Sequence, residues 1–155
     1  MTQVALETPD QPEVIALIAA LDDYQRSLYP PESCHLLDLA TLVQPHVLFA
    51  VARDSFGQAV GCAAIVLQGE DGELKRCFVR PGQRGQGVAS QLLGLLEQQA
   101  LAAGCRGWLR LETGPRQAEA LAFYRRHGYA ECGRFGGYPD DPWSVFMHKR
   151  LGAAA

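Results

Sequence analysis

The feature that most constrains this chain is a strand-like run followed by a glycine-rich turn and a long helical pattern, over residues 73–101. The extended run stops at Arg80-Pro81, because proline donates no ladder hydrogen bond and restricts the residue before it. Apolar residues then recur at helical spacing: Val88, Leu92, Leu93, Leu96 and Ala100. This spacing predicts a helix with one buried face, ended by Gly104 as a left-handed cap.

Gly85 and Gly87 lie where this predicted helix begins. Glycines there allow a ligand to approach the backbone closely, and the first helical amides have no partner within the helix. The helix dipole and the Arg84 charge both attract phosphate. We therefore predict a site for a diphosphate-bearing cofactor; the alternative is that the two glycines serve the turn alone.

Residues 85–90 also resemble a dinucleotide-binding fingerprint. However, the predicted strand before them, Glu73 to Val79, lacks the apolar character of a buried parallel strand. Instead, Arg84-Gly85-Gln86-Gly87-Val88-Ala89 resembles the Arg/Gln-x-x-Gly-x-Gly/Ala acetyl-coenzyme A signature of the GNAT superfamily of N-acetyltransferases. Residues 117–129 resemble the other signature of that family, Asn-x-x-Ala-x-x-Leu/Phe-Tyr-x-x-x-Gly-Phe/Tyr. The resemblance covers nearly the whole chain.

The resemblance implies acetyl-CoA as cosubstrate and a set of residues that bind it. The backbone around Phe78 and Val79 would pair with the pantetheine arm like an added strand. Gln117 stands where the family has asparagine and would contact the same arm. Tyr124 would face the coenzyme sulfur as the general acid; from its helical position alone, it could equally be a core aromatic. The predicted cofactor-binding residues are Phe78, Val79, Arg84, Gly85, Gln86, Gly87, Val88, Ala89, Gln117 and Tyr124.

Some family members place a glutamate base at the position of Glu73, which we therefore predict to be catalytic together with Tyr124. Strand alternation puts Glu73 on one face with Lys75, Cys77 and Val79. The alternative is a solvated acid at a strand start. Glu73, Glu112, Tyr29 or an ordered water could each accept the amine proton, and the sequence does not choose among them.

Two polar and aromatic segments are candidates for the acceptor site. Residues 29–35 combine an aromatic, an acid, a hydroxyl and an imidazole, and in the family the helices here commonly border the acceptor pocket. The loop over residues 135–143 is rich in aromatics and acids. The alternative for the first segment is a solvated turn. The predicted substrate-binding residues are Tyr29, Glu32, Glu112 and Tyr138.

The remaining periodicities complete the predicted fold. Strands are predicted at residues 2–7, 47–53, 59–67, 73–79, 107–112, 129–133 and 144–149; helices are predicted from Pro12 to before Pro30, from Pro31 through Leu42, from Val88 to Gly104, and from Pro115 to His127 with Gly128 as its cap. The strand after the long helix should pair parallel to the strand before it. We predict an α/β, GNAT-like fold: a mixed, mostly antiparallel twisted sheet of about seven strands, with helices on both faces.

Length and composition set further limits. A chain of 155 residues is predicted to form a single domain, residues 1–155, and a net charge of -3 gives no general attraction for nucleic acid or anionic membranes. The start has no secretory pattern and no run could span a bilayer, so we expect a cytoplasmic protein. The five scattered cysteines contain no C-x-x-C, so neither a disulfide frame nor a metal site is predicted. A homodimer is common in the family.

The predicted reaction is direct acetyl transfer to the primary amine of a small molecule. We expect that amine to carry a carboxylate as well, because acids and arginines are mixed around the predicted pocket: Glu73, Glu112, Asp140 and Asp141 against Arg110, Arg116 and Arg134. Two alternatives stay open. One is acetylation of lysines or N-termini in proteins or peptides, and the other is a module that binds acetyl-CoA without turnover.

Overall fold

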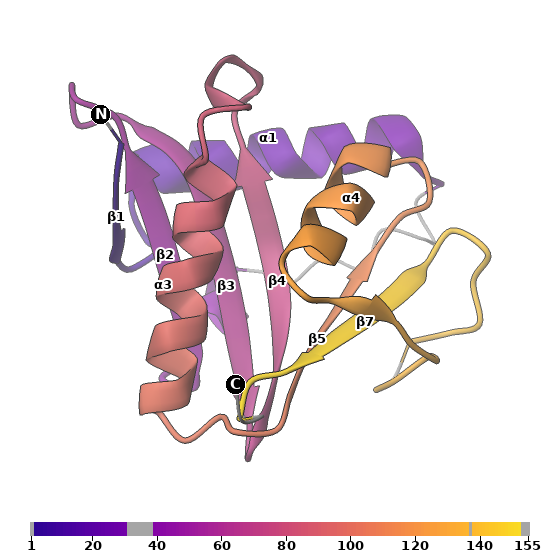
Figure 1. Cartoon of the computed structure of the whole chain (residues 1–155). Coiled ribbons are helices and arrows are strands. Elements are labelled where there is room, and N and C mark those ends of the chain that lie inside the picture. Colours follow the sequence, from indigo (N-terminus) through magenta and orange to yellow (C-terminus); the bar gives the residue numbers. More distant parts are fainter. Residues whose placement is uncertain (1, 31–38, 137, 153–155) are drawn as a thin grey trace.

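One mixed sheet dominates the structure, a computed structural model that describes residues 2–30, 39–136 and 138–152 (Figure 1). Its strand order is β1-β2-β3-β4-β5-β7-β6, and only the neighbouring strands β4 and β5 run parallel. The strands are β1 (Gln3–Leu6), β2 (Val47–Arg53), β3 (Ala59–Gln68), β4 (Asp71–Val79), β5 (Trp108–Thr113), β6 (Ala130–Glu131) and β7 (Val145–Arg150). The predicted sheet and its parallel pair are confirmed.

Helices cover both faces of the sheet, as predicted. The two on one face are α1 (Pro12–Leu28) and α2 (Leu39–Leu42); α3 (Val88–Ala102) and α4 (Ala118–Arg126) lie on the other (Figure 1). A short 3-10 helix, η2 (Pro81–Gln83), connects β4 to the turn before α3. None of the helices in the described ranges is long and apolar enough to cross a membrane.

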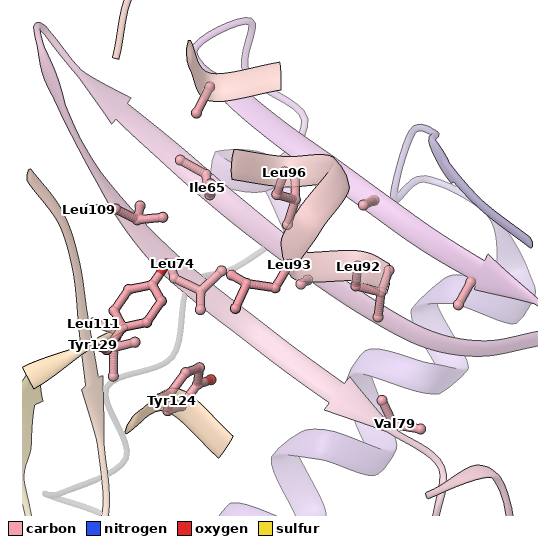
Figure 2. Packing of buried hydrophobic residues seen from close by; sticks show 14 of the residues in the cluster. Ile65, Leu74, Val79, Leu92, Leu93, Leu96, Leu109, Leu111, Tyr124 and Tyr129 are labelled. Carbon is pink, nitrogen blue, oxygen red and sulfur yellow. The ribbon is translucent and has the colours of Figure 1, made fainter. Parts of the chain in front are cut away.

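The apolar face of α3 packs on the sheet as its periodicity predicts. Its buried residues are Val88, Leu92, Leu93, Leu96 and Ala100, and the helix packs mainly on β2 and β3, with further contacts to β1 and β4. Leu92, Leu93 and Leu96 belong to the same apolar cluster as Ile65 and Leu74 (Figure 2). Each fully buried leucine contributes roughly 1.5–3 kcal/mol. Gly104 follows the helix with a φ of 95°, so the predicted left-handed cap is confirmed.

A bulge in β4 overturns the predicted alternation. Arg76 has a φ of 59°, and the pairing with β3 shifts between Cys62 and Ala64. The extra residue reverses the side-chain direction beyond it. Cys77 therefore packs with the α3 core cluster on the face opposite Glu73, and so does Val79. The prediction that all three share one face is wrong, because alternation assumes an unbroken strand.

The parallel strands β4 and β5 are paired over only three residues each, from Gly72↔Leu109 to Leu74↔Leu111. Beyond this point they diverge, and α4 lies over the opening between them (Figure 1). The two strands therefore splay apart toward the ends that carry Val79 and Thr113.

Three element boundaries differ clearly from those predicted. α4 begins at Ala118 and not at Pro115, because Gln117 has the non-helical φ and ψ of an N-cap, -106° and 64°, and the first helical hydrogen bond runs from the Leu121 amide to the Gln117 carbonyl. β6 is shorter than predicted, and β4 begins earlier, at Asp71, after a tight turn. Of the helix predicted from Pro31, the residues 31–38 lie outside the described part of the chain.

Candidate active site

A cleft of about 750 Å³ lies between α3 and α4 and reaches the opening beside β4. Gly85 and Gly87 lie on its wall with φ angles of 80° and 77°, and Gly87 is the N-cap of α3. A Cβ atom added at either glycine would meet no atom within 4 Å. The first turn of α3 therefore presents its amides to an accessible space, a geometry that suits phosphate.

The cleft is basic although the whole chain is acidic. Its lining contains the side chains of Arg84, Arg116 and Arg126 against a single acid, Glu119. Arg84 is fixed by a 3.1 Å hydrogen bond from its Nε to the Val79 carbonyl, and its guanidinium lies against the ring of Tyr24. A basic cleft of this kind fits the phosphates of a CoA-type ligand.

Tyr124 lies at the inner end of the cleft. It extends from α4 toward β4, beside Leu111 and Tyr129 (Figure 2), and is 7% exposed. Burial raises the pKa of its hydroxyl well above the usual value, and the nearby Cys77 thiol raises it further. Burial likewise raises the pKa of Cys77. Tyr124 is thus a protonated hydrogen-bond donor, and Cys77 is a poor nucleophile.

A second, smaller cavity of about 110 Å³ adjoins the first. The two share lining residues, namely Leu21, Cys77, Gln117, Ala120 and Tyr124. A thioester carried in the large cleft could therefore meet a ligand held in the small cavity at the Tyr124 hydroxyl. A cavity of about 150 Å³ holds benzene, so this one accepts a ligand group of only a few heavy atoms.

Tyr29 forms part of the cavity wall by reaching from the end of α1 to the start of α4. Its hydroxyl donates to Gln117 Oε1 at 3.2 Å and accepts from the Arg116 amide at 3.2 Å. Gly114 permits this approach, because a Cβ atom there would overlap the Tyr29 hydroxyl and ring. Trp143 completes this side, with its ring centroid 6.2 Å from that of Tyr29.

Glu112 supplies a carboxylate to the cavity wall. Ser144 Oγ donates to its Oε2 at 2.9 Å, and no cation of the described residues lies within ion-pair distance of it. Burial raises the pKa of this carboxyl to about 7, although the Ser144 hydrogen bond and the Lys75 charge oppose the change. A carboxyl with this pKa can accept and release protons at neutral pH.

Glu73, predicted to be catalytic, is buried and bound to its neighbours. Tyr138 Oη donates to its Oε2 at 2.5 Å, and Lys75 Nζ lies 3.0 Å from the same oxygen. Lys75 also hydrogen-bonds the Tyr138 hydroxyl. The three residues join the loop before β7 to β4. Glu73 is not among the residues that line either cavity, so its carboxylate is engaged in holding this loop.

Most predicted site residues lie on the two cavities. Every predicted cofactor-binding residue lines the large cleft except Gln86, which lies in a separate hollow with Phe56. Tyr29 and Glu112 line the small cavity, Tyr138 contacts Glu73 beside it, and Glu32 lies outside the described residues. Trp143, from the predicted loop over residues 135–143, also lines the small cavity, whereas sequence reasoning missed Lys75, Arg76, Thr113 and Gly114. Among the described residues, no cluster of histidine, cysteine or acids could hold a metal ion.

Comparison with known proteins identifies the family. The model of the Acetyltransferase (GNAT) family matches residues 13–129. An IAA acetyltransferase of Azospirillum brasilense is 49% identical over 150 residues, which are 96% of this chain and 97% of the relative. The chain belongs to the GNAT acetyltransferase family. This GNAT protein is therefore an N-acetyltransferase that uses acetyl-CoA as cosubstrate.

Further relatives agree with the GNAT assignment. A solved structure from Klebsiella pneumoniae subsp. pneumoniae MGH 78578, assigned as an acyl-CoA N-acyltransferase, is 41% identical with a TM-score of 0.82 and covers 97% of this chain and 98% of its own. An aminoalkylphosphonate N-acetyltransferase of Salmonella typhimurium is 33% identical over 98 residues, 59% of this chain and 62% of the relative.

Proposed function

We propose that the enzyme transfers the acetyl group of acetyl-CoA directly to the primary amine of a small molecule that also carries an anionic group. The observation that carries this proposal is the junction at Tyr124 between a large basic cleft and a small cavity walled by Glu112. The cleft fits the coenzyme, and the cavity volume of about 110 Å³ limits the reacting end of the acceptor to a few atoms.

Glu112 is the proposed proton acceptor. An alkylamine with a pKa of about 10.4 is almost wholly protonated at pH 7, so one proton must pass to solvent before the nitrogen lone pair can attack. As the neutral amine nitrogen bonds to the acetyl carbon, that nitrogen becomes acidic, and Glu112 takes the second proton. Glu73 is held by Lys75 and Tyr138. Burial raises the pKa of Tyr29, which therefore stays protonated and serves as a wall.

Tyr124 is the proposed donor to the departing sulfur. The C–S bond of the thioester breaks as the N–C bond forms, and the negative charge moves to sulfur. A thiol with a pKa of about 8.5 is a stronger acid than a tyrosine whose pKa is raised above 10. Tyr124 therefore stabilises the thiolate through a hydrogen bond, and the sulfur takes its proton from solvent when the coenzyme leaves.

The anionic group of the acceptor is assigned to Lys75. Two of the three ammonium protons of Lys75 serve Tyr138 and Glu73, so the third can bind a carboxylate or phosphonate. Of the arginines predicted for this role, Arg110 pairs with Asp71 at 3.1 Å, and neither Arg110 nor Arg134 lines a cavity. Support also comes from the Salmonella relative, because an aminoalkylphosphonate combines an amine with an anion.

A panel of amines tests the proposal. Release of free coenzyme thiol is measured at one acetyl-CoA concentration with amino acids, aminoalkylphosphonates, their counterparts without the acidic group, and lysine-containing peptides. The small amines with an anionic group should react fastest. Faster acetylation of the amines without that group would contradict the role of Lys75. Faster acetylation of peptides would favour a protein-modifying enzyme, and no turnover with any amine would favour a binding module.

A further inference from the structure

One part of the large cleft is lined by Ser90 from the first turn of α3 and by Arg126 from the last turn of α4. Ser90, the third residue of α3, and His127, which follows α4, are joined by a hydrogen bond of 3.0 Å between Oγ and Nε2. The His127 ring packs on that of Phe123, with centroids 4.5 Å apart. These contacts fix the basic last turn of α4 beside the amides at the start of α3.

The last turn of α4 carries two arginines in different situations. Arg125 forms a 2.7 Å ion pair with Glu131 and does not line the cleft. Arg126 lines the cleft and has no acidic partner among the described residues. A cation near a helix C-terminus interacts favourably with the helix dipole. That interaction alone would not require the Arg126 side chain to border the cleft.

We propose that Arg126 binds the 3′-phosphate of the acetyl-CoA ribose, and that this contact makes the enzyme distinguish acetyl-CoA from its 3′-dephospho form. The assignment rests on the proposal that the large cleft is the cofactor site. The order of groups in the coenzyme supports it. With the thioester at Tyr124 and the pyrophosphate on the amides of residues 84–89, the next group along the coenzyme is the phosphorylated ribose, which we place beside Ser90 and Arg126 because both line the cleft.

The charge of this phosphate matches an exposed arginine. A phosphate monoester carries a charge of about −1.5 to −2 at pH 7 and three acceptor oxygens. The guanidinium fork can donate two parallel hydrogen bonds to such a group, which lysine cannot do. The backbone amides of residues 84–89 are the proposed donors to the pyrophosphate. Arg126 is the proposed cation for the 3′-phosphate.

Calorimetric titration with CoA and with 3′-dephospho-CoA tests the proposal without any turnover. The wild-type protein should bind CoA roughly tenfold more tightly, the scale of one hydrogen-bonded charge pair. Arg126→Gln should bring the two affinities within about twofold by weakening CoA alone. Arg125→Gln is the matched control and should leave the tenfold preference intact. High salt should reduce the preference of the wild-type protein, because salt screens an exposed pair.

Several results would overturn the proposal. They are equal wild-type affinity for both ligands, an equal loss for both in Arg126→Gln, and loss of the preference in Arg125→Gln. A double variant, Gly85→Val with Gly87→Val, tests the underlying cleft assignment, with Gly82→Val as its control, since Gly82 is open and has no positive φ. If the double variant binds CoA normally, both proposals fail. If it loses both ligands while Arg126→Gln keeps the preference, only the Arg126 proposal fails.

Discussion

The Tyr124 hydroxyl is where the two cavities meet, and its burial decides what it can contribute. Because its pKa is raised, Tyr124 cannot give up its proton to a thiolate at low cost. Its proposed contribution is a preorganised hydrogen bond to the charge that develops on sulfur, and such a bond is stronger in a site from which water is excluded.

Tyr124→Phe keeps the ring in the core and removes only the hydroxyl. Turnover should fall roughly a hundredfold or more, the loss typical of one such donor. The affinity for acetyl-CoA should stay within about twofold, because the lost hydrogen bond forms mainly in the transition state. Steady-state kinetics and calorimetry measure the two quantities. If Tyr124→Phe turns over at close to the wild-type rate, Tyr124 contributes only to packing and not to catalysis.

As the proposed base, Glu112 should make the reaction depend on pH near neutrality. With a pKa of about 7, its carboxylate form predominates above pH 7 and is lost below it. The acceptor-dependent kcat/KM should therefore fall about tenfold per pH unit below pH 7. Glu112→Gln should remove this fall in kcat/KM below pH 7 and should lower kcat/KM at pH 8 by roughly a hundredfold. If kcat/KM of the Glu112→Gln variant still falls below pH 7, the base is another group.

At the scale of elements, the acceptor cavity depends on the contact between the end of α1 and the start of α4. Tyr29 can reach Gln117 only because Gly114 has no side chain. The amides of Gly114 and Arg116, which precede the helix, donate to Gln117 Oε1 and to the Tyr29 hydroxyl, and the helix begins at Ala118. Gly114 has no positive φ, so glycine is required here by the close approach of the Tyr29 ring and not by the backbone conformation.

Gly114→Ala tests this contact. The added methyl group should displace Tyr29, and a displacement costing about 1–2 kcal/mol should raise the KM of the acceptor roughly tenfold. The KM of acetyl-CoA should change less than about twofold. Gly133→Ala is the control, because its Cβ position is open. An unchanged acceptor KM would show that the Tyr29 wall does not limit binding.

The sequence predicts the elements well where one local rule decides them. The α3 helix, its glycine N-terminus and the parallel β5 follow from periodicity, turn chemistry and crossover geometry. The bulge at Arg76 could not be predicted, because a positive φ at an arginine has no sequence signal. The engagement of Glu73 by Tyr138 depends on a contact across 65 residues, which no local pattern encodes.

For the site, the family signatures predict the cofactor cleft more completely than the acceptor cavity. The cleft wall includes Gly85 and Gly87 and lies within the two signature segments, and both are visible in the sequence. The small cavity proposed for the acceptor is lined by residues of α1, β4, β5, α4 and the loop before β7. The wall that they form depends on tertiary packing, so Lys75 was missed, and Trp143 was predicted only as part of the loop over residues 135–143.

At the scale of the whole molecule, the divergence of β4 and β5 organises the proposed chemistry. It connects the cleft between α3 and α4 with the small cavity beneath Tyr29 and Trp143. Both substrates can therefore be bound at once, with their reacting atoms at Tyr124. Cys77 lies at the same junction, but burial raises its pKa and disfavours a thiolate that could carry the acetyl group.

The central claim, direct transfer between two bound substrates, is tested by initial velocities measured while acetyl-CoA and the best amine of the panel are both varied. Direct transfer predicts double-reciprocal lines that intersect, because both substrates must be bound before coenzyme is released. Parallel lines, together with an acetyl adduct on Cys77 when the amine is omitted, would contradict the account and show that the acetyl group passes through the enzyme.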